Sequence, residues 1–284
     1  MSTQASKTAS GSYASVYVLG GTAYKSFARE FEGAKNEFDA LASVYTTCNP
    51  GAFLLAPKPI ALQNADKSVD PAFAGEAVPA DVVAELGKLP PPAIAMERIY
   101  DIPDALKGAL AQIIKLDEKK APEIKLCLLG MGREAIRGPV SLASVLLTPT
   151  TYADLAQRVK GAVALPPVED VVRGIGAAVA RIHWRAGYDA NDIEFAMGAD
   201  GSGHVKFFVF DFNKMERVGE KPDTDKLVKA FRSNNKYYPL SGALFEVLKA
   251  GYESQLDGAS KEKGEAFLAA LTKSSAEKEK SGTA

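Results

Sequence analysis

Four carboxylates lie close together in one part of the chain. Asp189, Asp192 and Glu194 fall within six positions, and Asp211 follows a mostly apolar run at 205–210. Clustered carboxylates are costly unless they bind a cation, share a proton or hold a cationic substrate. The first three are therefore candidate catalytic acids and bases in a cleft with Asp211 at its edge. Alternatively, Asp189 and Asp192 cap a helix or stabilise a turn.

Neighbouring side chains add candidates for substrate binding in the same cleft. We assign this role to Asp211, Asn213, Tyr188 and His183. Two alternatives stay open, because His183 also suits a structural role at the end of its helix and Tyr188 also suits the core. Gly187 has no side chain and permits a sharp turn, so the acidic loop can bend back toward Asp211.

The chain has few side chains of the kinds that hold metals in proteins. Its two cysteines, Cys48 and Cys127, are far apart in apolar surroundings, and its two histidines complete no paired zinc spacing. The thiols are therefore interpreted as small buried hydrophobic groups. We expect no metal and no cofactor.

The elements that position these residues are read from hydrophobic periodicity. Strands at 14–19 and 22–27 flank a tight turn, and a helical pattern at 30–44 follows. Lys25 in mid-strand and Glu37 in mid-helix both have apolar neighbours, which predicts an ion pair between strand and helix. A second helix at 166–185 has an apolar stripe spaced i, i+3, i+4 and leads into the acidic loop.

Composition and patterning divide the chain of 284 residues into two lobes between polar ends. The expected parts are a disordered start at 1–12, a first lobe at 13–99 with a mobile insertion at 63–92, a helical second lobe at 100–273 and a disordered tail at 274–284. No apolar run is long enough to cross a membrane, and the polar start is not a secretion signal, so a cytoplasmic protein is expected. The net charge of -1 does not favour a surface that binds nucleic acid throughout, although the segment 206–236 has a modest excess of cations.

This arrangement resembles the protein-kinase-like fold, especially its aminoglycoside-phosphotransferase branch. Lys25 and Glu37 match the lysine and glutamate that pair in the first lobe of that fold. Asp192 matches the catalytic-loop aspartate, and residues 211–213 match the metal-binding Asp-Phe-Gly. The resemblance implies an α+β, bilobal fold with a small antiparallel-sheet N-lobe and a mostly helical C-lobe.

Two departures weaken the match to an active kinase. Met197 occupies the position of the asparagine that holds the second magnesium ion, and methionine does not ligate magnesium. The glycine-rich cover of ATP is reduced to Gly20 and Gly21. A phosphotransferase using ATP and magnesium and a non-catalytic pseudokinase-like binding module are the alternatives to the function considered next.

At closer range the chain is similar to a fungal family of unknown-function domains often labelled zinc-finger proteins. The segments that show the similarity are 16–26, 36–42, 95–100, 180–195 and 209–215. Members of what looks like the same group are arginine-containing cyclodipeptide synthases, which condense two aminoacyl-tRNAs into a diketopiperazine. The resemblance implies a cyclo-arginine-Xaa product of secondary metabolism, with arginyl-tRNA and a second aminoacyl-tRNA as partners and neither DNA nor a membrane.

The candidate residues suit that chemistry. Cyclisation needs a base to deprotonate an α-ammonium and negative charge to hold a guanidinium, and Asp189, Asp192 and Glu194 offer both. Tyr188 or Tyr238 is a candidate proton relay. The alternative is that each tyrosine packs in the hydrophobic core. The sequence thus predicts an acidic catalytic pocket that holds no metal ion.

Overall fold

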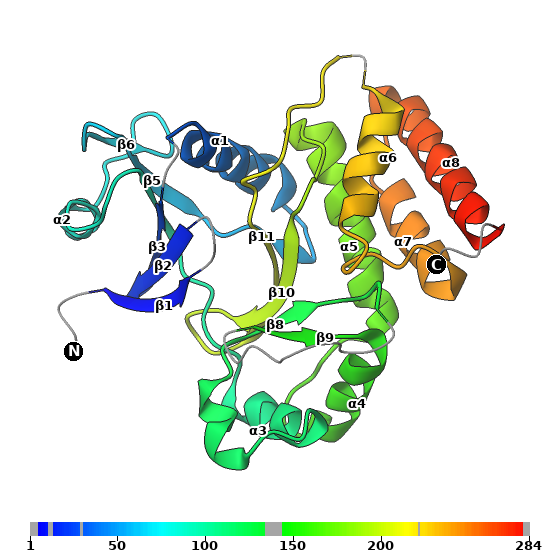
Figure 1. Ribbon diagram of the computed structural model, residues 1–284, viewed down its shortest axis with the longest axis horizontal. Coiled ribbons are helices and arrows are strands. Elements are labelled where there is room, and N and C mark those ends of the chain that lie inside the picture. The colour runs from blue at the N-terminus through cyan, green and yellow to red at the C-terminus, as the bar shows by residue number, and fades with distance from the viewer. Residues whose placement is uncertain (1–4, 11–13, 29–30, 134–143, 221, 281–284) are drawn as a thin grey trace.

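The computed structural model describes residues 5–10, 14–28, 31–133, 144–220 and 222–280. It is an α+β structure, with an antiparallel sheet of six strands in the N-terminal part and a mixed sheet of five strands in the C-terminal part. Most of the helices lie beside the second sheet, at the C-terminal side of the molecule (Figure 1). Within the described residues, no helix is long and apolar enough to cross a membrane.

The first sheet presents Lys25 on the face that packs against α1. Its strands, in spatial order, are β1 (Ser6–Ser10), β2 (Ala14–Leu19), β3 (Thr22–Phe27), β7 (Ala93–Glu97), β5 (Pro59–Gln63) and β6 (Val69–Pro71). The expected hairpin joins β2 and β3, with Gly20 at a φ of 57° that favours glycine. Because side chains alternate along a strand, Tyr24 packs with α2 (Ala80–Leu86) while Lys25 points to α1 (Phe31–Cys48).

Two segments of the first part differ from expectation. The start at 1–12 was predicted to be disordered, but residues 6–10 form the edge strand β1 through backbone pairing with β2, which needs no apolar pattern; residues 1–4, 11 and 12 lie outside the described residues. The insertion at 63–92 was predicted to be mobile. It folds onto the sheet instead, because Val82 and Leu86 of α2 are buried and Gln63 donates a hydrogen bond to the carbonyl oxygen of Leu86.

The second sheet draws four of its five strands from residues 100–273, which were predicted to be mostly helical, and takes β4 from the predicted first lobe. Its strands, in spatial order, are β4 (Leu54–Leu55), β11 (Val205–Phe210), β10 (Glu194–Ala199), β8 (Leu126–Leu129) and β9 (Ser144–Leu147). The helices beside it are α3 (Asp104–Ile113), α4 (Pro149–Val159), α5 (Val168–Arg181), α6 (Thr224–Ser233), α7 (Gly242–Glu253) and α8 (Gly258–Lys280). The helix α8 runs through residues that were expected to form a disordered tail, and Ser275 on it is buried; residues 281–284 lie outside the described residues.

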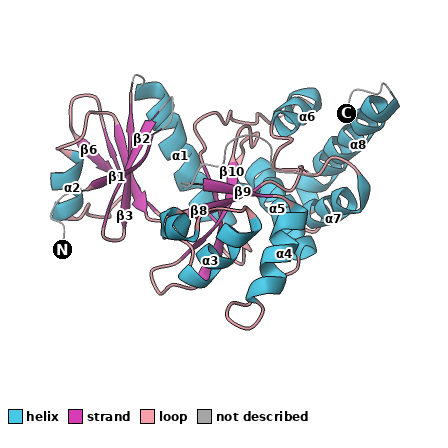
Figure 2. Ribbon diagram, turned by 60° about the horizontal axis from the view of Figure 1, so that its bottom comes forward, coloured by secondary structure: helices cyan, strands magenta, loops and turns pink. Residues whose placement is uncertain are grey.

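The helix α1 connects the two parts of the molecule. It lies between the first sheet and the helices of the second part (Figure 2). The Asn36 side chain donates to the carbonyl oxygen of Met215 at 2.9 Å, and the Ser43 hydroxyl donates to that of Ala186 at 3.2 Å. The predicted stripe of α5 is buried in the core, as Val172, Ile175 and Val179 show. This packing fixes α1 and the ends of β10 and β11 relative to one another.

Candidate functional site: an acidic pocket between the two sheets

A pocket of about 530 Å³ lies between the two sheets. Strands β2, β3 and β7 of the first sheet and β8, β10 and β11 of the second contribute to its walls. Its lining is rich in charge. The acidic residues are Glu37, Glu97, Asp101, Asp192, Glu194 and Asp211, and the basic residues are Lys25, Arg98, Lys125 and Lys214. Acids therefore outnumber bases, which favours a cationic ligand over an anionic one.

Lys25 of the first sheet contacts both α1 and the end of β11. Its Nζ lies 2.7 Å from Oε1 of Glu37 and 2.6 Å from Oδ1 of Asp211. The predicted Lys25–Glu37 ion pair is thus confirmed. Burial on its own lowers the pKa of an ammonium, but the charges of Glu37 and Asp211 outweigh it and raise the pKa of Lys25 above its usual range. Lys25 is therefore a permanent cation, held by two carboxylates.

Two acids of the site sit on unusual backbone. Asp192 has a φ of 57° and Asp211 a φ of 65°. Side-chain-bearing residues are uncommon in this region, and the strain, of order 1–3 kcal/mol for each, clusters at functional sites. The apolar run of β11 pairs with β10 along its whole length, so the chain must turn sharply at Asp211. The turn brings Asp211 to Lys25.

Glu194 opens β10 and is fixed by a residue far along the chain. Its Oε1 accepts a hydrogen bond of 2.6 Å from the hydroxyl of Tyr237 and lies 3.4 Å from Nζ of Lys236. Tyr237 is fully buried, and burial together with Glu194 raises the pKa of its hydroxyl. Tyr237 was not among the tyrosines predicted for the site, which were Tyr188 and Tyr238. Its signal was the aromatic turn before Pro239.

Asp192 completes this wall of the pocket. Its Oδ2 lies 2.6 Å from Nζ of Lys214. Asn213 also lines the pocket, as predicted for a binding residue. Within the described residues, Oδ1 of Asn213 and Oε2 of Glu37 are buried and have no hydrogen-bond partner. Both atoms are acceptors, so a ligand rich in N–H donors would satisfy them.

Three predicted site residues lie outside the pocket lining. Oδ1 of Asp189 accepts hydrogen bonds from the backbone N–H groups of Asn191 and Glu216, at 3.1 and 3.0 Å. Asp189 thus has the turn-stabilising role that was its alternative, and burial raises its pKa. Asp189 is therefore not among the residues that line the pocket.

His183 and Tyr188 belong to the core under the acidic loop, which was the alternative place for each, and do not line the pocket. The His183 ring lies 2.9 Å from the Tyr252 hydroxyl and 3.3 Å from the Asp189 carbonyl oxygen. Burial lowers the pKa of His183 to about 4, so the ring is neutral near pH 7. Tyr188 is buried beneath the guanidinium of Arg217, at 4.7 Å from the ring centre.

The chemistry of the site is that of carboxylates. Within the described residues, no three side chains among Asp, Glu, His and Cys converge as a metal site. Met197 is buried in β10. Cys48 and Cys127 are buried free thiols, as predicted. The arrangement can hold a cation and can accept a proton. Comparison of the chain with known protein families and with curated proteins finds no match.

Proposed function

We propose that the chain is an aminoacyl-tRNA-dependent cyclodipeptide synthase on a bilobal, kinase-like scaffold, and that it forms a cyclo-arginine-Xaa diketopiperazine. The observation that supports this most strongly is the excess of acceptors in the pocket. Asp192, Glu194 and Asp211 line it, and the buried oxygens of Asn213 and Glu37 have no donor among the described residues. A guanidinium offers five N–H donors and a permanent charge.

The acids take different roles in this proposal. Asp211 and Asn213 hold the arginyl side chain, because Asp211 is already fixed by Lys25 and Asn213 supplies an unsatisfied acceptor. Glu194 is the general base. Tyr237 and Lys236 both contact its Oε1, which leaves Oε2 to take the proton. Asp192 lies on the same wall and steadies the ammonium before it is deprotonated.

The reaction needs two acyl transfers and no redox step. Glu194 removes a proton from the α-ammonium of one aminoacyl ester, and the resulting amine attacks the ester carbonyl of the other. The C–O bond to the ribose breaks, and the ribose oxygen leaves with a proton. The remaining α-amine then attacks the dipeptidyl ester in the same way, which closes the ring and releases the second tRNA.

The proposal is tested by expressing the chain in a heterologous host and measuring cyclodipeptides by mass spectrometry. Replacing Glu194 with Gln keeps the acceptor for Tyr237 but removes the base, so product should fall about a hundredfold or more. Asp192→Asn should cost about tenfold to a hundredfold, the usual loss for one charge-assisted contact. Asp189→Asn is the matched control, because an amide oxygen still accepts both backbone bonds, and its yield should stay near wild type. No cyclodipeptide from the wild type, or full yield from Glu194→Gln, would refute the proposal.

A second candidate is a small-molecule phosphotransferase. The contact of Lys25 with both Glu37 and Asp211 favours it, because kinase-like enzymes use such a lysine, glutamate and metal-binding aspartate. Buried Met197 and the short glycine turn argue against it. We expect no micromolar ATP–magnesium binding by calorimetry. Binding that disappears in Lys25→Ala would establish this candidate, and the absence of both product and nucleotide binding would leave a non-catalytic binding module.

A further inference from the structure

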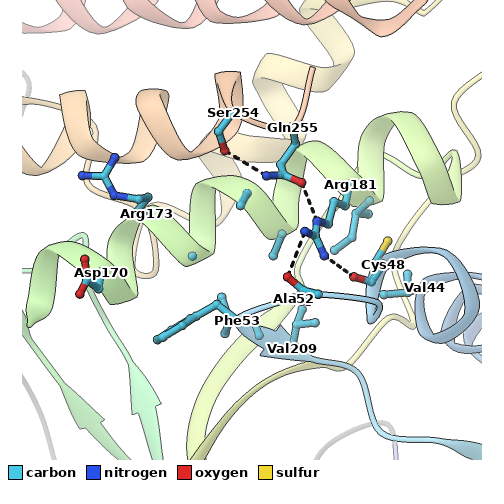
Figure 3. Close-up of a pocket in the computed structure, with 16 residues that line it drawn as sticks. Val44, Cys48, Ala52, Phe53, Asp170, Arg173, Arg181, Val209, Ser254 and Gln255 are labelled. Atoms are coloured by element: carbon cyan, nitrogen blue, oxygen red, sulfur yellow. Dashed lines mark hydrogen bonds between the residues drawn. The ribbon is translucent and has the colours of Figure 1, made fainter. Parts of the chain in front are cut away.

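A second pocket, of about 340 Å³, lies on the other side of β11 from the acidic pocket. Val209 lines it, whereas the next residue, Phe210, lines the acidic pocket, as expected for alternating side chains of one strand. Its walls come from the C-terminal end of α1, the turn before β4, one face of α5 and the end of α7 (Figure 3). Its volume is within the range of roughly 300–1,000 Å³ that is usual for small-molecule sites.

The polar wall of this pocket is a buried arginine. Arg181 is 9% exposed. Its guanidinium donates to the carbonyl oxygens of Cys48 at 2.7 Å, Pro50 at 3.1 Å and Gly51 at 3.3 Å, and to Oε1 of Gln255 at 2.8 Å. These bonds use four of the five N–H donors of a guanidinium. The carbonyl groups at the end of α1 stabilise the charge in part.

The charge of Arg181 is not neutralised by a neighbouring acid. Within the described residues, no carboxylate forms an ion pair with it. The other charged residues of the lining, Asp170 and Arg173, are exposed and of opposite sign, so the pocket keeps a net positive charge. A buried charge without a counterion is costly, and an anionic ligand would lower that cost.

The opposite wall is flat and apolar. Phe53 is 38% exposed, which is unusual for a large hydrophobic residue of this chain. Its ring stacks on Phe207 at 4.9 Å between ring centres. It also lies over α5 at Gly174, where a Cβ atom would be 2.4 Å from the ring. Together with the small side chain of Ala177, these residues form a slot beside an aromatic face.

We propose that this pocket binds a small aryl carboxylate, with its ring against Phe53 and its carboxylate at the remaining N–H of Arg181. The ligand class follows from the two walls: a single negative charge matches Arg181, and a planar apolar body matches the slot. Inorganic phosphate would match the charge alone. The site is separate from the acidic pocket, and its occupation does not depend on the function proposed there.

The experiment uses 4-fluorobenzoate as the probe and follows its binding to the full chain by fluorine NMR. The neutral 4-fluorobenzamide has the same shape and should bind about tenfold more weakly or worse, since it lacks the charge-assisted contact. A tenfold excess of inorganic phosphate should not displace the probe. The acidic pocket repels an anion and should not contribute to the signal.

Variants locate the binding. Ala177→Phe places a large ring in the slot and should abolish binding, whereas Phe53→Ala should weaken it about tenfold. Arg181→Met should also abolish binding. Because this variant loses the contacts to the end of α1, its folding must first be verified by circular dichroism. Arg158→Gln is the control, because Arg158 is an exposed arginine paired with Asp154 on α4, and its affinity should stay within about twofold of wild type. Equal binding of the acid and the amide, displacement by phosphate, or undiminished binding in Ala177→Phe would overturn the proposal.

Discussion

At the scale of single residues, the ammonium of Lys25 connects three distant stretches of chain. It lies on β3, and it contacts Glu37 on α1 and Asp211 at the end of β11. Glu37 is nearly fully buried, so its charge depends on Lys25 for compensation. The same contact sets the position of Asp211 at the edge of the acidic pocket.

Removal of this ammonium should destabilise the whole chain. Lys25→Met leaves a buried carboxylate unpaired, and we expect the free energy of unfolding to fall by about 3–5 kcal/mol. Urea unfolding followed by circular dichroism measures the change. Lys35→Met is the control, because the Lys35–Asp39 pair is exposed on α1 and should contribute less than about 1 kcal/mol. Equal effects of the two substitutions would contradict the assigned role of Lys25.

Only part of the site could be predicted at this scale. A charge among apolar neighbours identified Lys25 and Glu37, and the end of an apolar strand identified Asp211. The same logic did not decide between the two uses of Asp189, because a carboxylate in a tight turn satisfies backbone N–H groups just as readily as it faces a pocket. The aromatic turn before Pro239 marks Tyr237, but its contact with Glu194 depends on the path of the chain after α6, which local sequence patterns do not give.

At the scale of elements, α5 and α7 approach closely at two glycines. A Cβ atom on Gly251 would lie 2.1 Å from the carbonyl oxygen of Arg173, and one on Gly176 would lie 2.0 Å from that of Leu248. Periodicity predicted the buried stripe of α5 but not this crossing. Of the sheet behind it, the apolar strand that ends at Asp211 was predicted. Strands β4 and β9 were not, since they are too short for a pattern and pair through backbone contacts far apart in sequence.

The close approach predicts a strong effect of one added methyl group. Gly251→Ala must separate the two helices, and we expect a loss of about 1–3 kcal/mol in the free energy of unfolding. Gly108→Ala is the matched control, because Gly108 is an exposed position of α3 and a Cβ there meets no atom within 4 Å. That substitution should instead stabilise the chain by about 0.5–1 kcal/mol, through the helix propensity of alanine. Denaturant titrations of both variants test the pair, and a neutral Gly251→Ala would show that the helices are not tightly packed.

At the scale of the whole molecule, the two sheets, α1 and the C-terminal helices depend on one another. Helix α1 is bonded to the first sheet through Glu37 and to the second part through Asn36 and Ser43. The order of strand and helix patterns predicted two lobes. Their relative placement could not be predicted in this way, because it rests on side-chain contacts between segments far apart in sequence.

The pH dependence of the free energy of unfolding should reveal the protonation of His183 in the core. His183 has its pKa lowered to about 4, against an ordinary value of 6.5. Above pH 6.5 the ring is neutral in both states. Between pH 6.5 and 4 the unfolded chain binds the proton first, so stability should fall as the pH falls, by about 2 kcal/mol between pH 7.5 and 5. Urea unfolding at both pH values measures this loss, and His183→Gln, which does not titrate, should lose about 2 kcal/mol less than the wild type over that range. Parallel pH profiles for the two proteins would contradict it.

The position of Lys25 between two carboxylates also affects its reactivity. Only a neutral amine attacks an activated ester, and each unit of increase in pKa lowers the neutral fraction of a lysine tenfold. The charges of Glu37 and Asp211 therefore make Lys25 a poor nucleophile, although it lines the pocket where the reactive esters are proposed to bind. Under the proposed function, this low reactivity would protect Lys25 from acylation by the substrate esters.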